Sequence, residues 1–227
     1  MMKFKIPVFI VLIVVLAITA CKKFDDPPVK LPTTYLNFIN PSADTLNFYV
    51  NGGRLNTLSS TYPLGSSGYI QSPLGEQNYQ VKRFGQSEVI FSVPIKLDSG
   101  GVYSFYAIDR TIENSFTTKD TLSTLSNKVS SIRFVHTSPK LGAVDIVITD
   151  DAKKAVRINN RGFKSASVFV TVKEGVETIQ VYKTGTTTLL SQEDRILQIG
   201  RAYTLFTRTG LTDAGATGAS TGLIINQ

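Results

Sequence analysis

The chain of 227 residues contains one histidine, His136, and one cysteine, Cys21, which limits the chemistry available to it. A multi-histidine zinc site is excluded, and a cysteine-containing one cannot form. A Ser-His-Asp triad could use only His136, with Asp145 and several serines nearby, and no Gly-x-Ser-x-Gly elbow is present. We expect His136 to be a strand-end residue that is hydrogen-bonded to the following turn through Thr137 or Ser138.

Acidic side chains are the next candidates for catalysis or metal binding. Glycoside hydrolysis needs two acids facing one cleft, but Glu174, Glu177, Glu193 and Asp194 are marked only by their charge, and their neighbours suggest turns. The pair Asp150-Asp151 lacks the Asp-x-Asp-x-Asp-Gly spacing of a calcium loop, so a solvated turn is favoured. We therefore predict no catalytic residue, no metal site and no cofactor.

Exposed tyrosine rings could contact a ligand, because aromatic faces stack on sugars. Tyr62 and Tyr69 flank a loop of Pro, Leu, Gly and Ser at positions 63–68, and loops on rigid scaffolds often carry binding residues. These two tyrosines are the predicted ligand contacts. The chain has no tryptophan, which weakens the case for glycan binding.

The first 20 residues have the order of an export signal. Lys3 and Lys5 precede a 15-residue apolar run, residues 6–20, whereas a membrane span needs about 20 apolar residues. The run ends at Ile18-Thr19-Ala20-Cys21, which resembles the lipobox of bacterial lipoproteins. That resemblance implies cleavage before Cys21 and attachment of a diacylglycerol to its sulfur. An ordinary secreted protein or an uncleaved helical anchor are the alternatives.

Residues 21–33 predict an extended tether, because they include Pro27, Pro28 and Pro32 and have little apolar periodicity. With a single cysteine the exported chain cannot form an internal disulfide, which favours acylation as the role of Cys21. Lys22 rather than aspartate follows the cysteine, which by analogy with lipoprotein sorting argues against inner-membrane retention. We predict outer-membrane anchoring, with the periplasmic or cell-surface face left open.

The charge of the chain is moderately basic. Removing residues 1–20 leaves 22 basic against 17 acidic residues, and most of the excess lies in the second half. A nucleic-acid site would cluster basic residues with stacking aromatics, whereas here they are scattered. We expect that the protein does not bind nucleic acid. The expected partners are the bilayer, contacted through acylated Cys21, and a glycan or envelope proteins.

The chain repeats itself at an offset of 100 residues. The identities pair Gly75, Gln80, Val81, Gly85, Leu97, Gly100 and Tyr103 with Gly175, Gln180, Val181, Gly185, Leu197, Gly200 and Tyr203. A period this long indicates duplicated domains rather than solenoid units. We predict two domains, residues 34–127 and 128–227.

Each copy has the alternating pattern of β-strands, as in Tyr79-Gln80-Val81 and Ile179-Gln180-Val181. Asn51-Gly52 after a strand predicts a tight hairpin turn. The expected fold class is therefore all-β, with two tandem antiparallel β-sandwich domains of the immunoglobulin or transthyretin type. A single closed barrel made by both halves is the alternative.

The second copy carries a family resemblance. Residues 132–139, with sequence IRFVHTSP, and residues 144–148, with sequence VDIVI, resemble the opening of the domain-of-unknown-function 4397 family. The first copy departs from it, with Asn40 and Asn47 where His136 and Asp145 stand. The resemblance implies a β-sandwich module of exported bacterial proteins and brings no catalytic residues.

These observations predict a non-enzymatic, membrane-anchored lipoprotein that acts as a binding, spacer or assembly module at the cell envelope. A glycan-binding accessory lipoprotein of a polysaccharide uptake system is the second hypothesis. A hydrolase is the third.

Overall fold

The structure is a computed structural model that describes residues 33–122, 129–209 and 219–226. Within these ranges it contains sixteen strands and no helix. The predicted signal, Cys21 and nearly all of the tether lie outside them. No helix in the described ranges is long and apolar enough to cross a bilayer.

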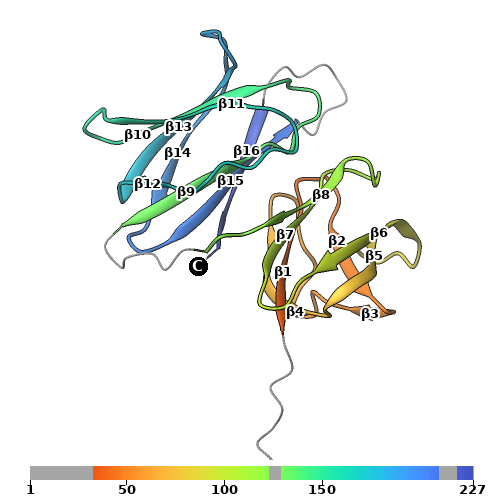
Figure 1. The fold of residues 1–227 in the computed structure, drawn as a ribbon. Helices are drawn as coiled ribbons and strands as arrows, with labels where there is room; N and C mark the ends of the chain where they lie inside the picture. Colours follow the sequence, from red (N-terminus) through yellow and green to blue (C-terminus); the bar gives the residue numbers. More distant parts are fainter. Residues whose placement is uncertain (1–32, 123–128, 210–218, 227) are drawn as a thin grey trace, which may run out of the picture. The chain divides into compact units, whose positions relative to one another are not determined.

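The first eight strands form a sandwich of two four-stranded sheets, ordered β4-β1-β7-β8 and β3-β2-β5-β6 (Figure 1). Asn51 and Gly52 both have positive φ, at 49° and 79°, and make the tight turn between β2 and β3. The strands are β1 (Thr34–Ile39), β2 (Leu46–Val50), β3 (Gly53–Arg54), β4 (Ser66–Ser72), β5 (Gly75–Arg83), β6 (Val89–Leu97), β7 (Val102–Ala107) and β8 (Ser115–Lys119).

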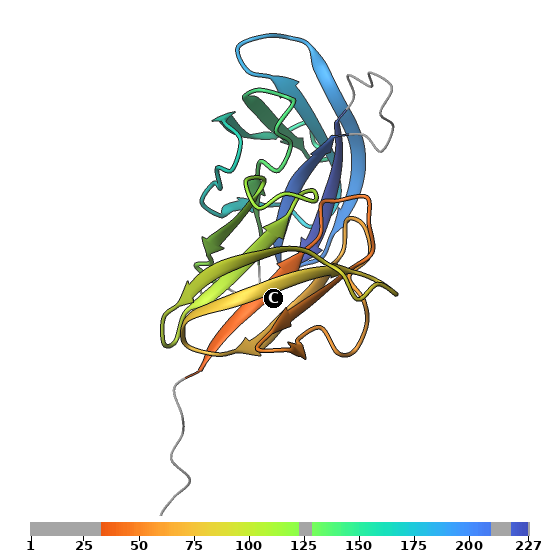
Figure 2. The ribbon, with the colours of Figure 1, turned by 90° about the vertical axis from the view of Figure 1, so that its right-hand side faces the viewer.

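The next eight strands repeat this arrangement, in sheets ordered β12-β9-β15-β16 and β11-β10-β13-β14 (Figures 1 and 2). A longer turn with Asp150 and Asp151 replaces the tight one of the first sandwich. The strands are β9 (Ser130–Val135), β10 (Val144–Thr149), β11 (Ala155–Arg161), β12 (Val170–Val172), β13 (Gly175–Lys183), β14 (Leu189–Leu197), β15 (Ala202–Thr209) and β16 (Ala219–Ile225).

The two sandwiches share their strand register, which confirms the internal repeat. Gly75 pairs with Leu97 on β5 and β6, and Gly175 pairs with Leu197 on β13 and β14. Both ladders slip by one residue after the same position, Val81 or Val181. The all-β sandwich prediction is therefore correct, and four separate sheets replace the alternative of one closed barrel.

The sheets were expected to be antiparallel throughout, but they are not. One pair in each sandwich is parallel, β1 with β7 and β9 with β15. The chain leaves β1 and β9 to build the opposite sheet before it returns, and such a long connection permits parallel pairing where a short hairpin cannot.

The cores of the two sandwiches are filled differently. The first contains a stack of aromatic rings, with Phe48 at centroid distances of 4.6 Å from Phe38, 5.1 Å from Tyr79 and 5.3 Å from Phe105. Branched aliphatic side chains dominate the second core, including Ile146, Ile179 and Leu205 at the places of Phe48, Tyr79 and Phe105. The second core is thus built from smaller side chains.

Residues 32–227 form one compact unit. A third hydrophobic cluster takes residues from both repeats, with Ile39 and Tyr106 from the first and Val135 and Phe206 from the second. All four side chains are fully buried. Burial of apolar surface therefore stabilises the joint between the repeats.

Candidate functional site

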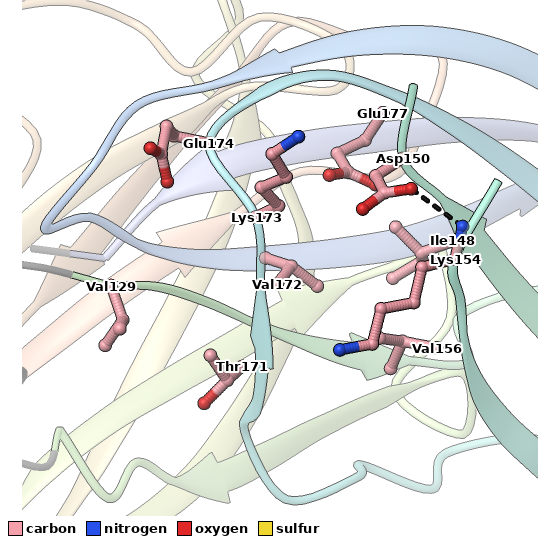
Figure 3. A pocket seen from close by; sticks show the side chains of 10 residues that line it. All are labelled: Val129, Ile148, Asp150, Lys154, Val156, Thr171, Val172, Lys173, Glu174 and Glu177. Atoms are coloured by element: carbon pink, nitrogen blue, oxygen red, sulfur yellow. Dashed lines mark hydrogen bonds between the residues drawn. The ribbon is translucent and has the colours of Figure 1, made fainter. Parts of the chain in front are cut away.

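A cavity of about 300 Å³ opens at one end of the second sandwich (Figure 3). This volume is at the lower end of the range of small-molecule sites. Its walls come from both sheets, at the turns that follow β10 and β12. The lining residues are Val129, Ile148, Asp150, Lys154, Val156, Thr171, Val172, Lys173, Glu174 and Glu177.

The difference in core volume explains the cavity. In the first sandwich the fully buried Tyr79 fills the corresponding end of the core, and its hydroxyl is 2.7 Å from the Ser72 hydroxyl. Ile179 and Val172 occupy these two positions in the second sandwich. Neither side chain reaches as far as a tyrosine ring, so space is left between the sheets.

Glu177 is the least expected residue of the cavity. It lies on the same inward face of β13 as Ile179 and Val181, and only 2% of its surface is exposed. Among the described residues no side chain or backbone group hydrogen-bonds to its carboxylate. Burial raises the pKa of Glu177, Asp150 raises it further, and Lys173 opposes the shift.

The other charged groups of the cavity are mostly paired. An oxygen of Asp150 accepts a hydrogen bond of 2.7 Å from the backbone N–H of Lys154. The Lys173 ammonium lies 2.7 Å from Asp151. Within residues 33–122, 129–209 and 219–226, no group of three His, Cys, Asp or Glu side chains could hold a metal ion.

Both ring nitrogens of His136 are hydrogen-bonded to backbone groups, so neither is available as a base or as a metal ligand. Nε2 is 2.7 Å from the Gly142 carbonyl oxygen, and Nδ1 accepts a hydrogen bond of 3.2 Å from the Ser138 N–H. The side chain is fully buried. The expected contact with the following turn is confirmed, through the Ser138 backbone.

Asn40, at the same position of the first repeat, has the same structural role. Its Oδ1 accepts from the Ser42 N–H at 3.0 Å, and its Nδ2 donates to the carbonyl oxygens of Asp44 and Thr61. An asparagine cannot act as a base, yet it ties down the same turn. This equivalence shows that the position serves the fold.

Asp145, the other member of the considered triad, is occupied elsewhere. It accepts hydrogen bonds from the backbone N–H groups of Asn160 and Gly185 and from the Thr184 hydroxyl. These backbone donors stabilise the carboxylate and lower the pKa of Asp145. The structure therefore does not bring Asp145 and His136 together as a catalytic pair.

The prediction of turns around the acidic residues is partly wrong. Glu174 lies in a turn, but Glu177 is within β13, and Glu193 and Asp194 are within β14. Polar residues occupy both faces of β14, so the sequence does not show the apolar alternation by which strands are recognised. Glu193 is paired with Arg195 at 2.5 Å, so it is not free for chemistry.

The two predicted ligand tyrosines are in different environments. Tyr62 is 66% exposed, as a ligand contact requires. Tyr69 is partly buried, and its hydroxyl donates to Asp120 at 2.5 Å and accepts from the Asn226 amide at 2.9 Å. The Tyr69 hydroxyl is thus engaged within the protein.

Asp120 belongs to a buried network that sequence reasoning missed. Its Oδ1 lies 2.8 Å from Nη1 of Arg133, and its Oδ2 accepts hydrogen bonds of 2.5 Å from Tyr69 and Ser104. The side chains of Arg133 and Asp120 are 3% and 0% exposed. Arg133 replaces Asn37 of the first repeat and lies on the face of β9 opposite to the core residues Ile132 and Phe134, so its position in the sequence gave no signal of burial.

Two segments of the chain, residues 34–147 and 130–220, match the family described as Domain of unknown function (DUF4397). The chain belongs to the DUF4397 family. Both sandwiches of this DUF4397 protein are covered by the matches. No curated protein matches it in sequence.

Among solved structures, the DUF4397 chain is similar to one described as alpha-glucan recognition by family 41 carbohydrate-binding modules from streptococcal virulence factors. The similarity covers 76% of this chain and 92% of that one, at 13% identity and a TM-score of 0.25. At these values it gives no information about a ligand of the DUF4397 chain.

Proposed function

We propose that this chain is a non-enzymatic lipoprotein, held at the outer membrane by acylated Cys21, whose joined sandwiches act as a rigid binding or spacer unit. Apolar packing between the repeats carries the proposal: Ile39 and Tyr106 of the first repeat are buried in one cluster with Val135 and Phe206 of the second, so opening the joint would expose apolar surface to water. A joint of this kind maintains the orientation of one module relative to the other. That property suits a spacer or a binding module at the end of a tether.

The anchoring half of the proposal is tested by cell fractionation. Cys21→Ala should move the protein from the membrane fraction to the soluble fraction, because one residue provides the whole lipid attachment. Unchanged membrane association would refute the lipoprotein role. Protease treatment of intact cells then distinguishes the cell-surface face from the periplasmic face.

Glycan binding is the second proposed function, and the exposed ring of Tyr62 favours it. A glycan array with the soluble form from Lys22 onward tests it directly. Tyr62→Ala should abolish any reproducible binding. Tyr69→Ala is a poor choice for this test, because it also removes the hydrogen bonds to Asp120 and Asn226.

A further inference from the structure

The cavity of the second sandwich combines an aliphatic wall with two carboxylates. Ile148, Val156 and Val172 provide apolar surface, and Asp150 and Glu177 lie next to one another at one end (Figure 3). Only 2% of the Glu177 residue is exposed, and a carboxylate on such a buried residue is normally matched by a cation or by hydrogen-bond donors. No group of the described residues donates a hydrogen bond to Glu177, and the nearby Lys173 is paired with Asp151.

Neighbouring lysines do not fill this role. The Lys173 ammonium is bonded to Asp151 at 2.7 Å. The Lys154 ammonium points away from the Glu177 carboxylate across the cavity (Figure 3). The carboxylate end of the cavity therefore has space for a cation that comes from outside.

The first repeat provides an internal comparison. Gln77 occupies the position of Glu177, and its amide is neutral and paired. Its Nε2 donates to the Leu74 carbonyl oxygen at 3.2 Å, and its Oε1 accepts from Nδ2 of Asn51 at 3.2 Å. The second repeat thus places a buried carboxylate beside its cavity at the position where the first repeat has a neutral, paired amide.

We propose that this cavity binds a small organic amine, with its ammonium group between Glu177 and Asp150 and its aliphatic part against Ile148, Val156 and Val172. An ammonium has three donors for the carboxylate oxygens, and bonds between charged partners are stronger than neutral ones. The inference rests on the binding role within the proposed function, and it names the ligand class.

The test uses the soluble form from Lys22 onward, which retains all three hydrophobic clusters. Backbone amide shifts are measured by NMR during titration with n-pentylammonium chloride. We expect shifts centred on residues 150–156 and 171–177, with a Kd of about 1 mM, as suits a ligand of this size. The matched probes 1-pentanol and pentanoate should bind at least about tenfold more weakly.

Variants built on the repeat make the test specific. Glu177→Gln introduces the residue of the first repeat and should weaken amine binding about tenfold. The matched control Gln77→Glu should leave binding unchanged. Val172→Ser/Ile179→Tyr, which copies Ser72 and Tyr79, should fill the cavity and abolish binding even if Glu177→Gln proves unstable.

Three results would overturn the inference. Equal affinity for 1-pentanol would reduce the site to an apolar hollow, and shifts of the same residues with calcium chloride would make it a metal site. An absence of shifts at these residues would remove the site altogether. Because the soluble form lacks Cys21, none of these results bears on membrane anchoring, which fractionation tests separately.

Discussion

Arg133 on β9 and Asp120 after β8 form a buried ion pair, with Nη1 2.8 Å from Oδ1, that connects the two repeats. Burial alone would lower the pKa of Arg133, but the nearby Tyr106 and Asp120 outweigh it, so the net shift is upward. The guanidinium stays charged. Its Nε also donates to the Thr204 hydroxyl at 2.8 Å, which holds it in place.

Asp120→Asn should lower the free energy of unfolding by about 3–5 kcal/mol, because it leaves the Arg133 charge buried without a counter-ion. Urea denaturation of the soluble form measures this. The matched control is Asp44→Asn, which breaks the exposed pair of Asp44 and Arg110 and should have little effect. Equal effects of the two variants would show that the buried pair does not stabilise the joint.

The same pair should limit motion between the repeats. Nitroxide labels at Lys96→Cys and Ile196→Cys, two exposed and equivalent positions, should give one narrow distance distribution. Adding Asp120→Asn should broaden it, because the unpaired arginine favours an open joint. Double electron–electron resonance measures both distributions, and a broad one without that substitution would argue against a rigid spacer.

His136 should make stability depend on pH. Burial lowers the pKa of His136, so the unfolded chain binds the proton more readily than the folded one. Protonation of Nδ1 would also remove the acceptor of the Ser138 N–H. Stability should therefore be full above the ordinary value of 6.5 and be lost as the pH falls below it.

The variant His136→Asn isolates this contribution, because Asn40 performs the same role in the first repeat. Urea denaturation between about pH 7 and pH 5 should show a smaller loss of stability for the variant than for the natural chain. Parallel pH profiles of the two proteins would mean that His136 titrates alike in the folded and unfolded states.

Gly222 should be intolerant of a side chain. A Cβ atom there would overlap the ring of Phe206, which is fully buried in the joint. Gly222→Ala should cost about 1–3 kcal/mol of unfolding free energy. Gly162→Ala is the matched control, since its Cβ would meet nothing within 4 Å. If both variants have the same melting temperature, the ring moves aside without cost.

Local patterns were enough to predict strands such as β5, the repeat and the sandwich class, but not the polar strand β14. Alternation in Tyr79-Gln80-Val81 and the turn at Asn51-Gly52 depend on neighbouring residues, so the sequence displays them directly. The expected role of His136 also followed from its neighbours. Export and acylation of Cys21 remain predictions from residues 1–21, which the described structure does not include.

Only the tertiary structure revealed the cavity and the joint. The cavity is lined by residues from strands of opposite sheets, such as Ile148 on β10 and Val172 on β12, and no local pattern relates their side-chain volumes. Likewise the joint combines Tyr69, Asp120, Arg133 and Asn226, which no sequence spacing relates. Alternation specifies which side chains point inward, whereas packing between sheets decides which of them meet.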